Sequence, residues 1–384
     1  MSGGWTSKPL GQIVTLQRGF DLPKRLRVDG EVPIISSSGP EDWHNEPIKI
    51  GPGLVTGRYG TIGKVFFVDG PYWPLNTTLF VSNFHGNNPR FCYYLLQRFD
   101  FAGQSGKTGV PGVNRNDLHA IKVLAPDDLP EQQAIAAALS DADGVVAGLE
   151  RVIAKKRLIK QGAMQDLLTA RRRLPGFSGE WEVRKLGGLG VCLRGVSYDG
   201  SADLFETETP ASIMLLRANN VQNGKIVYSD VQHVRKDRVK QVQHLKRGDV
   251  LVCMANGSRA LVGKAGIFWD EDGSAYTFGA FMGCFRPTAG AAADGYVPFL
   301  LQSDEYRNQL NVILSGSAIN NLAPSQILGF SFTMPVDHKE QQAIAAVLSD
   351  MDAEIQTLES RLAKARLVKE GMMQNLLTGR VRLV

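Results

Sequence analysis

Polar, glycine-rich segments hold the side chains in this sequence that could recognise a nucleic acid. Arg, Asn and Gln bond to base edges, while Lys, hydroxyl groups and backbone amides bind phosphates. In the first half of the chain the candidates are Arg58, Tyr59, Thr61 and Lys64, then Gln104, Ser105, Lys107, Thr108, Asn114 and Arg115. In the second half they are Asn256, Ser258, Arg259 and Lys264, then Ser315, Ser317, Asn320 and Asn321, with Arg217, Asn219 and Asn220 as an earlier group. The alternative for each position is an ordinary turn residue.

Each segment that resembles an enzyme motif departs from the pattern that the motif requires. A phosphate-binding loop requires a glycine, four residues, then Gly-Lys and Ser or Thr, but Gly57 lies one residue too far from Lys64 and Val65 follows the lysine. The segment NNPRF resembles the adenine-methyltransferase motif (D/N)PP(Y/F), yet Arg90 stands where the second proline is needed. The six histidines show no metal-ligand spacing, and no Ser, His and Asp set stands out. We therefore expect no catalytic residue, no metal and no cofactor.

Composition describes an ordinary soluble protein. A chain of 384 residues with 43% hydrophobic content is long enough for two or three domains. No secretory leader or membrane-length apolar stretch is visible, so we expect a cytoplasmic protein without a membrane partner. The cysteines, Cys92, Cys192, Cys253 and Cys284, are far apart and are expected to be reduced and mostly buried. The net charge of +5 fits a polyanion partner, but many proteins that bind none share it.

A long repeat organises the chain. The segment EQQAIAAALSDAD, which begins at Glu131, returns as EQQAIAAVLSDMD at Glu340, and the match continues at a constant offset of 209 residues. Of the 44 positions that start at these two glutamates, 27 are identical. The offset also pairs Pro126 with Pro335. Such a gapless match indicates an internal duplication.

Within each copy, apolar residues recur at alternating steps of four and three, which is the seam of a coiled coil. The seam residues are Ile135, Leu139, Val146, Leu149, Ile153, Ile344, Leu348, Ile355, Leu358 and Leu362, with Ala142 and Met351 in the same register. The pattern predicts two helices of about 35 to 40 residues, roughly 55 to 60 Å long, each packed on the other copy.

Charges and glycines give further expectations for these helices. The glutamates at 131 and 340 suit the positive end of a helix dipole, and Arg171, Arg173, Arg380 and Arg382 suit the negative end. Gly162 and Gly371 could mark a bend or the close approach of another backbone. Lys155, Lys156, Arg157 and Lys160 are candidates for contact with a partner, with solvation as the alternative.

A region rich in strand formers and turns precedes each helix. Both regions begin with a tryptophan, Trp5 or Trp181, and both contain a strand, a glycine-rich turn and a second strand, in 51–67 and 247–268. The expected organisation is a globular domain over 1–129, a helix over 130–174, a second globular domain over 175–338 and a second helix over 339–384. The fold class is α+β, with a pseudo-twofold internal repeat.

With its twofold EQQAIA helix start, its LLTA or LLTG helix end and its W...LG domain start, the chain resembles the specificity subunit of type I restriction-modification systems over essentially its whole length. The resemblance implies a non-enzymatic reader of double-stranded DNA. Each mixed α/β target-recognition domain would read one half of an asymmetric, bipartite target. The helices would form an antiparallel coiled coil that sets the spacing and docks two methyltransferase subunits per chain. A restriction or translocase subunit is a further partner in some such systems.

Three alternatives remain at this point. The chain could serve a different methyltransferase or nuclease arrangement, which its sequence does not distinguish. It could be a coiled-coil scaffold for protein interactions without DNA specificity, although polar loops at matching places in both domains disfavour this. A hidden enzyme would need a catalytic cluster that the sequence does not display. The bases recognised and the length of the gap between half-sites do not follow from the sequence.

Overall fold

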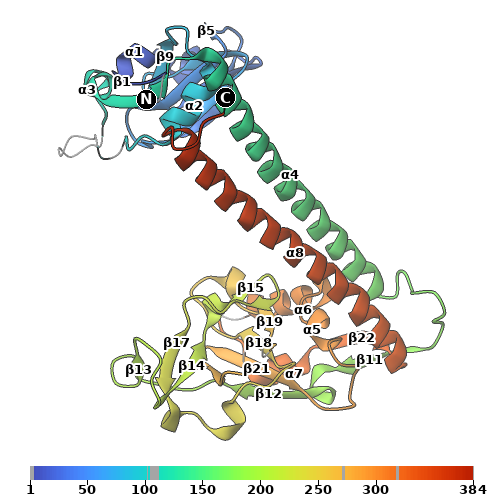
Figure 1. The fold of residues 1–384 in the computed structure, drawn as a ribbon. Helices are drawn as coiled ribbons and strands as arrows, with labels where there is room; N and C mark the ends of the chain where they lie inside the picture. The colour runs from blue at the N-terminus through green and yellow to red at the C-terminus, as the bar shows by residue number, and fades with distance from the viewer. Residues whose placement is uncertain (1–3, 102, 104–111, 270–272, 317–319, 384) are drawn as a thin grey trace. The chain divides into compact units, whose positions relative to one another are not determined.

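The computed structural model describes residues 4–101, 103, 112–269, 273–316 and 320–383. The chain divides into two compact units, one made of Met1–Val152 and Leu358–Val384, the other of Ile153–Thr357. Each unit therefore contains one globular part, one end of the first long helix and one end of the second (Figure 1).

The described residues of the first globular part form ten strands in three small sheets. The strands are β1 (Trp5–Pro9), β2 (Thr15–Arg18), β3 (Val32–Ser36), β4 (Gly39–His44), β5 (Lys49–Ile50), β6 (Gly53–Gly57), β7 (Val65–Val68), β8 (Pro71–Pro74), β9 (Thr78–Asn83) and β10 (Lys122–Pro126). They pair in the orders β2-β9-β6-β7, β4-β3-β8-β5 and β1-β10. The helices are α1 (Leu10–Ile13), α2 (Pro89–Gln97) and α3 (Arg115–Ala120). All five residues of β6 are buried, as expected for a central strand with an apolar run.

The second globular part repeats this plan with additions. Its strands are β11 (Trp181–Lys185), β12 (Gly190–Arg194), β13 (Leu204–Phe205), β14 (Ser212–Leu216), β15 (Val221–Gln222), β16 (Lys225–Ile226), β17 (Gln232–Arg235), β18 (Val250–Cys253), β19 (Ala265–Ile267), β20 (Tyr276–Phe278), β21 (Met282–Pro287) and β22 (Ser331–Pro335). The helices are α5 (Val297–Leu300), α6 (Asp304–Ser315) and α7 (Pro324–Gly329). The sheets have the orders β12-β21-β18-β19-β16-β15, β13-β17-β14-β20 and β11-β22.

Strand pairing confirms that the two globular parts are copies of one fold. Antiparallel β1 and β10 pair Trp5 with Pro126, and β11 and β22 pair Trp181 with Pro335. The hairpin β6–β7 corresponds to β18–β19, the two strand–turn–strand segments expected from the sequence. Parallel pairing also recurs, between β3 and β8 in the first copy and between β14 and β20 in the second.

The two long helices are α4 (Leu129–Leu167) and α8 (His338–Leu376), each of 39 residues, which confirms the expected length. They pair antiparallel inside each unit. In the first unit the start of α4 shares a hydrophobic core with the end of α8, through Ile135, Leu139 and Leu376. In the second unit the start of α8 shares a core with the end of α4, through Ile344, Leu348 and Leu167.

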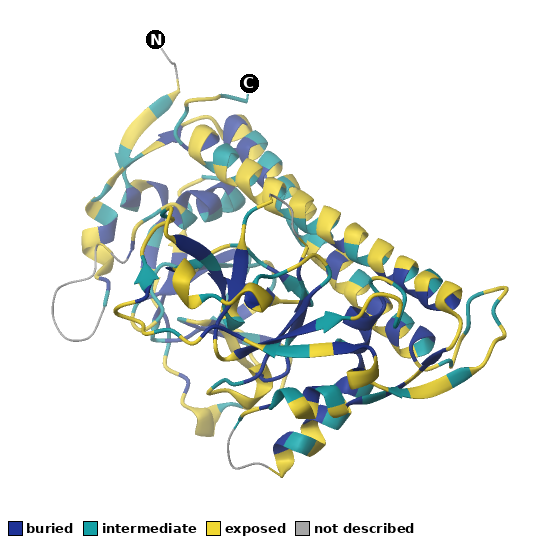
Figure 2. Cartoon of the chain, turned by 90° about the horizontal axis from the view of Figure 1, so that it is seen from below, coloured by how far each residue is buried: buried dark blue, intermediate teal, exposed yellow. Residues whose placement is uncertain are grey.

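The expected seam residues all lie at buried or half-buried positions. Ile135, Leu139, Ile344 and Leu348 are at most 1% exposed and belong to the domain cores, while Val146, Leu149, Leu358 and Leu362 are half-buried. Ile153 and Ile355 are 4% and 7% exposed. In Figure 2 the long helices carry exposed residues on their outer side, while the strands of the globular parts are mostly buried or half-buried.

The late helix glycines do not mark a close approach of another backbone. Both helices continue through Gly162 and Gly371, and a Cβ atom added at either position would meet nothing within 4 Å. Of the two alternatives, the close approach is therefore wrong, and the bend stays a prediction. Three of the four cysteines are buried and Cys192 is half-buried, and all four are free, as expected.

Candidate nucleic-acid interface

In the first globular part, the β6–β7 loop holds Arg58, Tyr59, Thr61 and Lys64. The chain before α3 packs on this loop, because Val113 N donates to Arg58 O at 3.0 Å and Tyr59 bridges to Gly112. The Arg58 guanidinium lies 4.6 Å from the centre of the Tyr59 ring, and Tyr59 is 40% exposed. The structure thus brings together two loops that the sequence proposed separately. Gln104, Ser105, Lys107 and Thr108 lie outside the described residues.

The second globular part shows the same convergence with different side chains. Leu322 N donates to Met254 O at 2.7 Å, and Ala255 bridges to Asn321. The amide of Asn320 donates to Gly257 O at 3.2 Å, which fastens the β18–β19 loop. Ser317 lies outside the described residues.

Three predicted residues from two distant segments line one hollow of about 450 Å³ in the second globular part. Arg217 and Asn219 follow β14, and Asn256 belongs to the β18–β19 loop. Asn219 Nδ2 donates to Asp230 Oδ2 at 3.0 Å, and the same carboxylate lies 3.4 Å from a guanidinium nitrogen of Arg217. The cavity therefore presents amide and guanidinium groups from a framework fixed by hydrogen bonds.

Other predicted residues have structural partners. Asn220 is buried, and its amide donates to Val227 O and Ser229 O, so this residue shapes a turn and is not available for direct contact with DNA, contrary to the expectation. Arg259 donates to Ser315 Oγ at 2.8 Å, and Asn114 caps α3 by accepting from Asn116 N. Thr61 and Lys264 are half-buried. Nine described candidates are exposed: Tyr59, Lys64, Asn114, Arg115, Asn219, Ser258, Arg259, Ser315 and Asn321.

Sequence reasoning missed two aromatic residues of this cavity, Tyr198 and Phe281. Phe281 is 71% exposed, although its neighbours on β21 are buried. Phe281 lies in the turn between β20 and β21, where a phenylalanine gives no periodic signal, so only the three-dimensional arrangement identifies it.

The EQQ motif is explained by contacts at the start of each long helix. Glu131 accepts from Trp5 Nε1 at 3.1 Å and pairs with Arg382 through two hydrogen bonds of 2.9 and 2.8 Å. Glu340 pairs in the same way with Arg173, at 2.8 and 2.5 Å. Both carboxylates are 1% exposed. The hydrogen bonds from Arg382 lower the pKa of Glu131 against the opposing effect of burial.

Arg173 and Arg382 were expected at helix ends for the helix dipole, but both lie beyond the last helical residue. They bind the first turn of the other long helix instead. The next residue of the motif joins each helix to its globular part, since Gln132 Nε2 donates to Pro126 O and Gln341 Nε2 donates to Pro335 O.

Equivalent ion pairs also connect the helices within each unit. Lys369 pairs with Asp143 at 2.5 Å, and Lys160, its counterpart at the offset of 209, pairs with Asp352 at 2.7 Å. Lys156 pairs with Glu354 at 2.6 Å. Lys160 is 9% exposed, so this lysine serves helix pairing and does not offer a partner surface as expected from the sequence.

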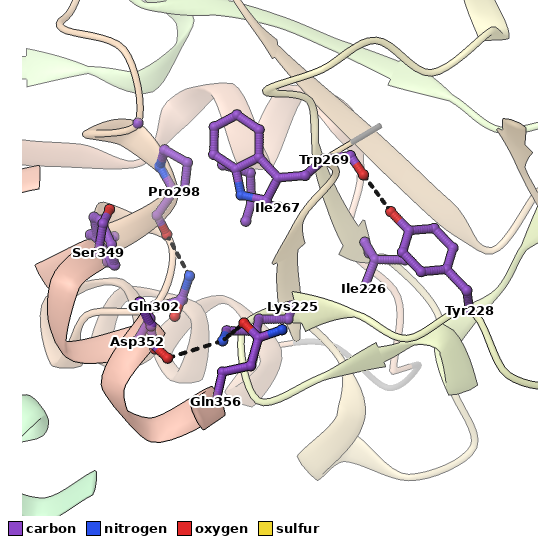
Figure 3. Close-up of a pocket in the computed structure, with 14 residues that line it drawn as sticks. Lys225, Ile226, Tyr228, Ile267, Trp269, Pro298, Gln302, Ser349, Asp352 and Gln356 are labelled. Atoms are coloured by element: carbon purple, nitrogen blue, oxygen red, sulfur yellow. Dashed lines mark hydrogen bonds between the residues drawn. The ribbon is translucent and has the colours of Figure 1, made fainter. Parts of the chain in front are cut away.

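A pocket of about 230 Å³ lies between the second globular part and α8 (Figure 3). On one side Lys225 Nζ donates to Asp352 O at 3.3 Å and to Gln356 Oε1 at 3.1 Å, so β16 is tied to the helix. On the other side Tyr228 donates to Trp269 O at 2.6 Å. The Lys225 bonds link the second globular part to the helix within this unit, while the Tyr228 bond joins two segments of the globular part itself.

Metal-binding clusters and membrane-spanning helices are both absent from the described part of the chain. There, no group of three or more His, Cys, Asp or Glu side chains could hold a metal ion. No described helix has the length and apolar composition that a bilayer crossing requires.

Named proteins with similar sequences are specificity subunits. The chain is 28% identical over 201 residues to the type I restriction enzyme StySPI specificity subunit of Salmonella potsdam and to the EcoKI specificity subunit of Escherichia coli (strain K12). Each alignment covers 52% of this chain and 42% of the relative, so the chain matches less than half of their length. The MjaVIII specificity subunit of Methanocaldococcus jannaschii is 26% identical over 294 residues, which are 73% of this chain and 67% of that protein.

Solved structures share the fold. The S subunit of a type I restriction-modification system from M. genitalium has a TM-score of 0.66 at 13% identity, covering 98% of this chain and 97% of that chain. A chain from a structure of type I system assembly and conformational transition has a TM-score of 0.56 at 16% identity, covering 99% of both chains. The family model described as "Type I restriction modification DNA specificity domain" matches residues 2–156 and 178–365. The chain therefore belongs to the family of type I restriction modification DNA specificity domains.

Proposed function

We propose that this chain is the non-catalytic specificity subunit of a cytoplasmic type I restriction-modification enzyme. Each globular domain, over 1–129 and 175–338, reads one half of an asymmetric bipartite DNA target. The observation that carries the proposal is the convergence of equivalent loops in both domains. Arg58 and Tyr59 occupy the positions in the first domain that Met254 and Ala255 occupy in the second. A shared framework with different side chains suits two readers of different sequences.

The two readers are joined by helices that differ little. The helix copies share most of their residues, and their buried glutamates and ion pairs occur twice at the same register. The helices are therefore suited to a function that is the same in both halves of the chain, whereas the loops, which differ, are not. We assign to it the spacing of the half-sites and the docking of methyltransferase subunits.

Two methyltransferase subunits per chain fit the exposed apolar residues of the helices. Leu158 and Ile159 on α4 are 69% and 46% exposed. Their counterparts at the offset of 209, Leu367 and Val368 on α8, are 68% and 52% exposed. Exposed apolar clusters commonly mark protein interfaces. Because the same pair occurs once in each helix, two copies of one partner would find the same surface.

Methylation mapping tests the function directly. The chain is expressed with its methyltransferase subunit in cells that lack other methylases, and methylated adenines are mapped by long-read sequencing. We expect one asymmetric motif with an unread gap. Replacing residues 1–129 with the same domain of another member of the family should change one half of the motif and leave the other half intact.

A single continuous methylated site would contradict the model of two readers. Methylation that does not depend on this chain would instead favour the protein-interaction scaffold. The matched control is a swap of the second domain, which should change only the other half.

A further inference from the structure

We propose that Phe281 is a specificity-determining residue of the second domain and contacts the methyl group of a thymine in the major groove. This inference rests on the proposed function and assigns one A·T pair to the half-site of the second domain. Apolar side chains, phenylalanine among them, distinguish thymine from the other bases through its C5-methyl group.

The backbone of Phe281 is fixed while its ring faces solvent. Its carbonyl oxygen accepts from Met254 N at 2.9 Å and from Ala255 N at 3.2 Å. Met254 O in turn accepts from Leu322 N at 2.7 Å. These bonds hold the backbone of Phe281 in place, and Phe281 is 71% exposed. A large apolar side chain held in water is costly unless a partner covers it.

The surroundings of the ring suit a base pair. Phe281 lines the same cavity as Arg217, Asn219 and Asn256. Asparagine bonds to the N6 and N7 groups of adenine, which lie beside the thymine methyl group in the major groove of an A·T pair. Arg217 and Asn219 are held at the cavity by their contacts with Asp230, so their positions are fixed before a ligand binds. Amide donors next to an aromatic ring match the polar and apolar edges of this base pair.

The equivalent position of the first domain is chemically different. Thr77 O accepts from Arg58 N at 2.9 Å and from Tyr59 N at 3.2 Å, the same pattern that Phe281 O makes. Thr77 is half-buried, and its hydroxyl has no partner in the described structure. The same backbone site therefore carries a small side chain with a buried hydroxyl in one domain and a large exposed aromatic ring in the other. A position that keeps its backbone bonds but changes its side chain is suited to set specificity.

The test uses the complete complex with the methyltransferase and a duplex that carries the mapped target. Each thymine of the second half-site is replaced in turn by deoxyuridine, which removes only the methyl group. We expect the complex with the wild-type chain to bind one of these deoxyuridine duplexes about fourfold more weakly than the thymine duplex, the effect of losing one buried methyl group. The Phe281→Ala complex should bind the thymine and deoxyuridine duplexes equally. In cells, Phe281→Ala should make that position degenerate and leave the first half-site unchanged.

Val183→Ala is the matched control, since Val183 is also 71% exposed and lies on β11, away from the cavity. It should leave the motif and the deoxyuridine effect unchanged. If Phe281→Ala keeps the wild-type motif, or weakens binding to all duplexes equally as loss of an inserted wedge would, the inference is overturned. A wild-type complex without a bipartite motif would instead refute the proposed function.

Discussion

At the residue scale, the side chains that are identical in the two copies mostly hold the frame together. Glu131 and Glu340 are nearly inaccessible and pair with arginines, and the following Gln132 and Gln341 bond to the globular parts. The helix dipole alone predicted an acid in the first turn, but it did not predict a buried one. Burial of a carboxylate requires a charged partner, and Arg382 or Arg173 supplies it.

The pairing of Glu131 with Arg382 predicts a loss of stability in acid. The folded-state pKa of Glu131 is lowered from its ordinary value of 4.5, chiefly by its hydrogen bonds to Arg382. A carboxyl group with a lowered pKa stabilises the fold above its unfolded-state pKa and loses this effect as the pH falls through the folded-state value. Glu131→Gln should therefore lower the melting temperature at about pH 7, and its deficit should shrink towards about pH 3.5. Calorimetric scans of the wild-type chain and of Glu131→Gln across this pH range measure the two melting temperatures and hence the deficit at each pH.

The control for this experiment is Glu46→Gln, because Glu46 is exposed. It should change the melting temperature little at either pH. A deficit of Glu131→Gln that is constant with pH would show that packing, rather than the ion pair, explains the loss.

At the element scale, the sequence predicted what depends on local periodicity. The seam period and the internal match predicted both long helices. The observed helices end earlier than expected, at Leu167 and Leu376, and Arg173 and Arg382 follow them and bind the other helix. The parallel pairing of β14 with β20 and the meeting of Arg217 with Asn256 join distant segments, for which no local pattern exists. The candidate loops could thus be identified from composition. The cavity that they share, and the place of Phe281 in it, could not be predicted from the sequence.

The helix glycines give a prediction at this scale. Glycine inside a helix costs roughly 0.5 to 1 kcal/mol relative to alanine, and neither Gly162 nor Gly371 has a neighbour that a methyl group would strike. Gly162→Ala and Gly371→Ala should each raise the free energy of unfolding by about this amount, measured by urea denaturation of the isolated chain.

Gly379 is the matched contrast. Its φ of +70° disfavours any side chain, and an added Cβ would lie 3.0 Å from the Trp5 ring. Gly379→Ala should destabilise the chain. If Gly162→Ala and Gly371→Ala were also destabilising, the two helix glycines would have a structural role that their open surroundings do not reveal.

At the scale of the whole molecule, the duplication gives each unit its own set of contacts between the two long helices. Each unit pairs one end of α4 with one end of α8 through its own ion pairs, Lys369–Asp143 in one and Lys160–Asp352 in the other. The contacts that register the helices are therefore complete within each unit. Around the middle of each helix the chain passes from one unit to the other. The seam residues there belong to neither of the two domain cores that the helix ends share: Val146, Leu149, Ile153, Ile355, Leu358 and Leu362. Added length is best tolerated there.

The proposed role of the helices as a spacer predicts the result of lengthening them. Three heptads inserted after both Val152 and Thr357 preserve the seam period and leave these ion pairs and the apolar residues at 158–159 and 367–368 within their units. The insert adds about 31 Å, roughly one turn of B-DNA. Selection from duplexes with randomised gaps should then recover both original half-sites with a gap about 9 or 10 base pairs longer. Insertion into α4 alone, the control, should abolish selection of any paired motif because the seam no longer matches. An unchanged gap in the doubly lengthened protein would show that the helices do not set the spacing.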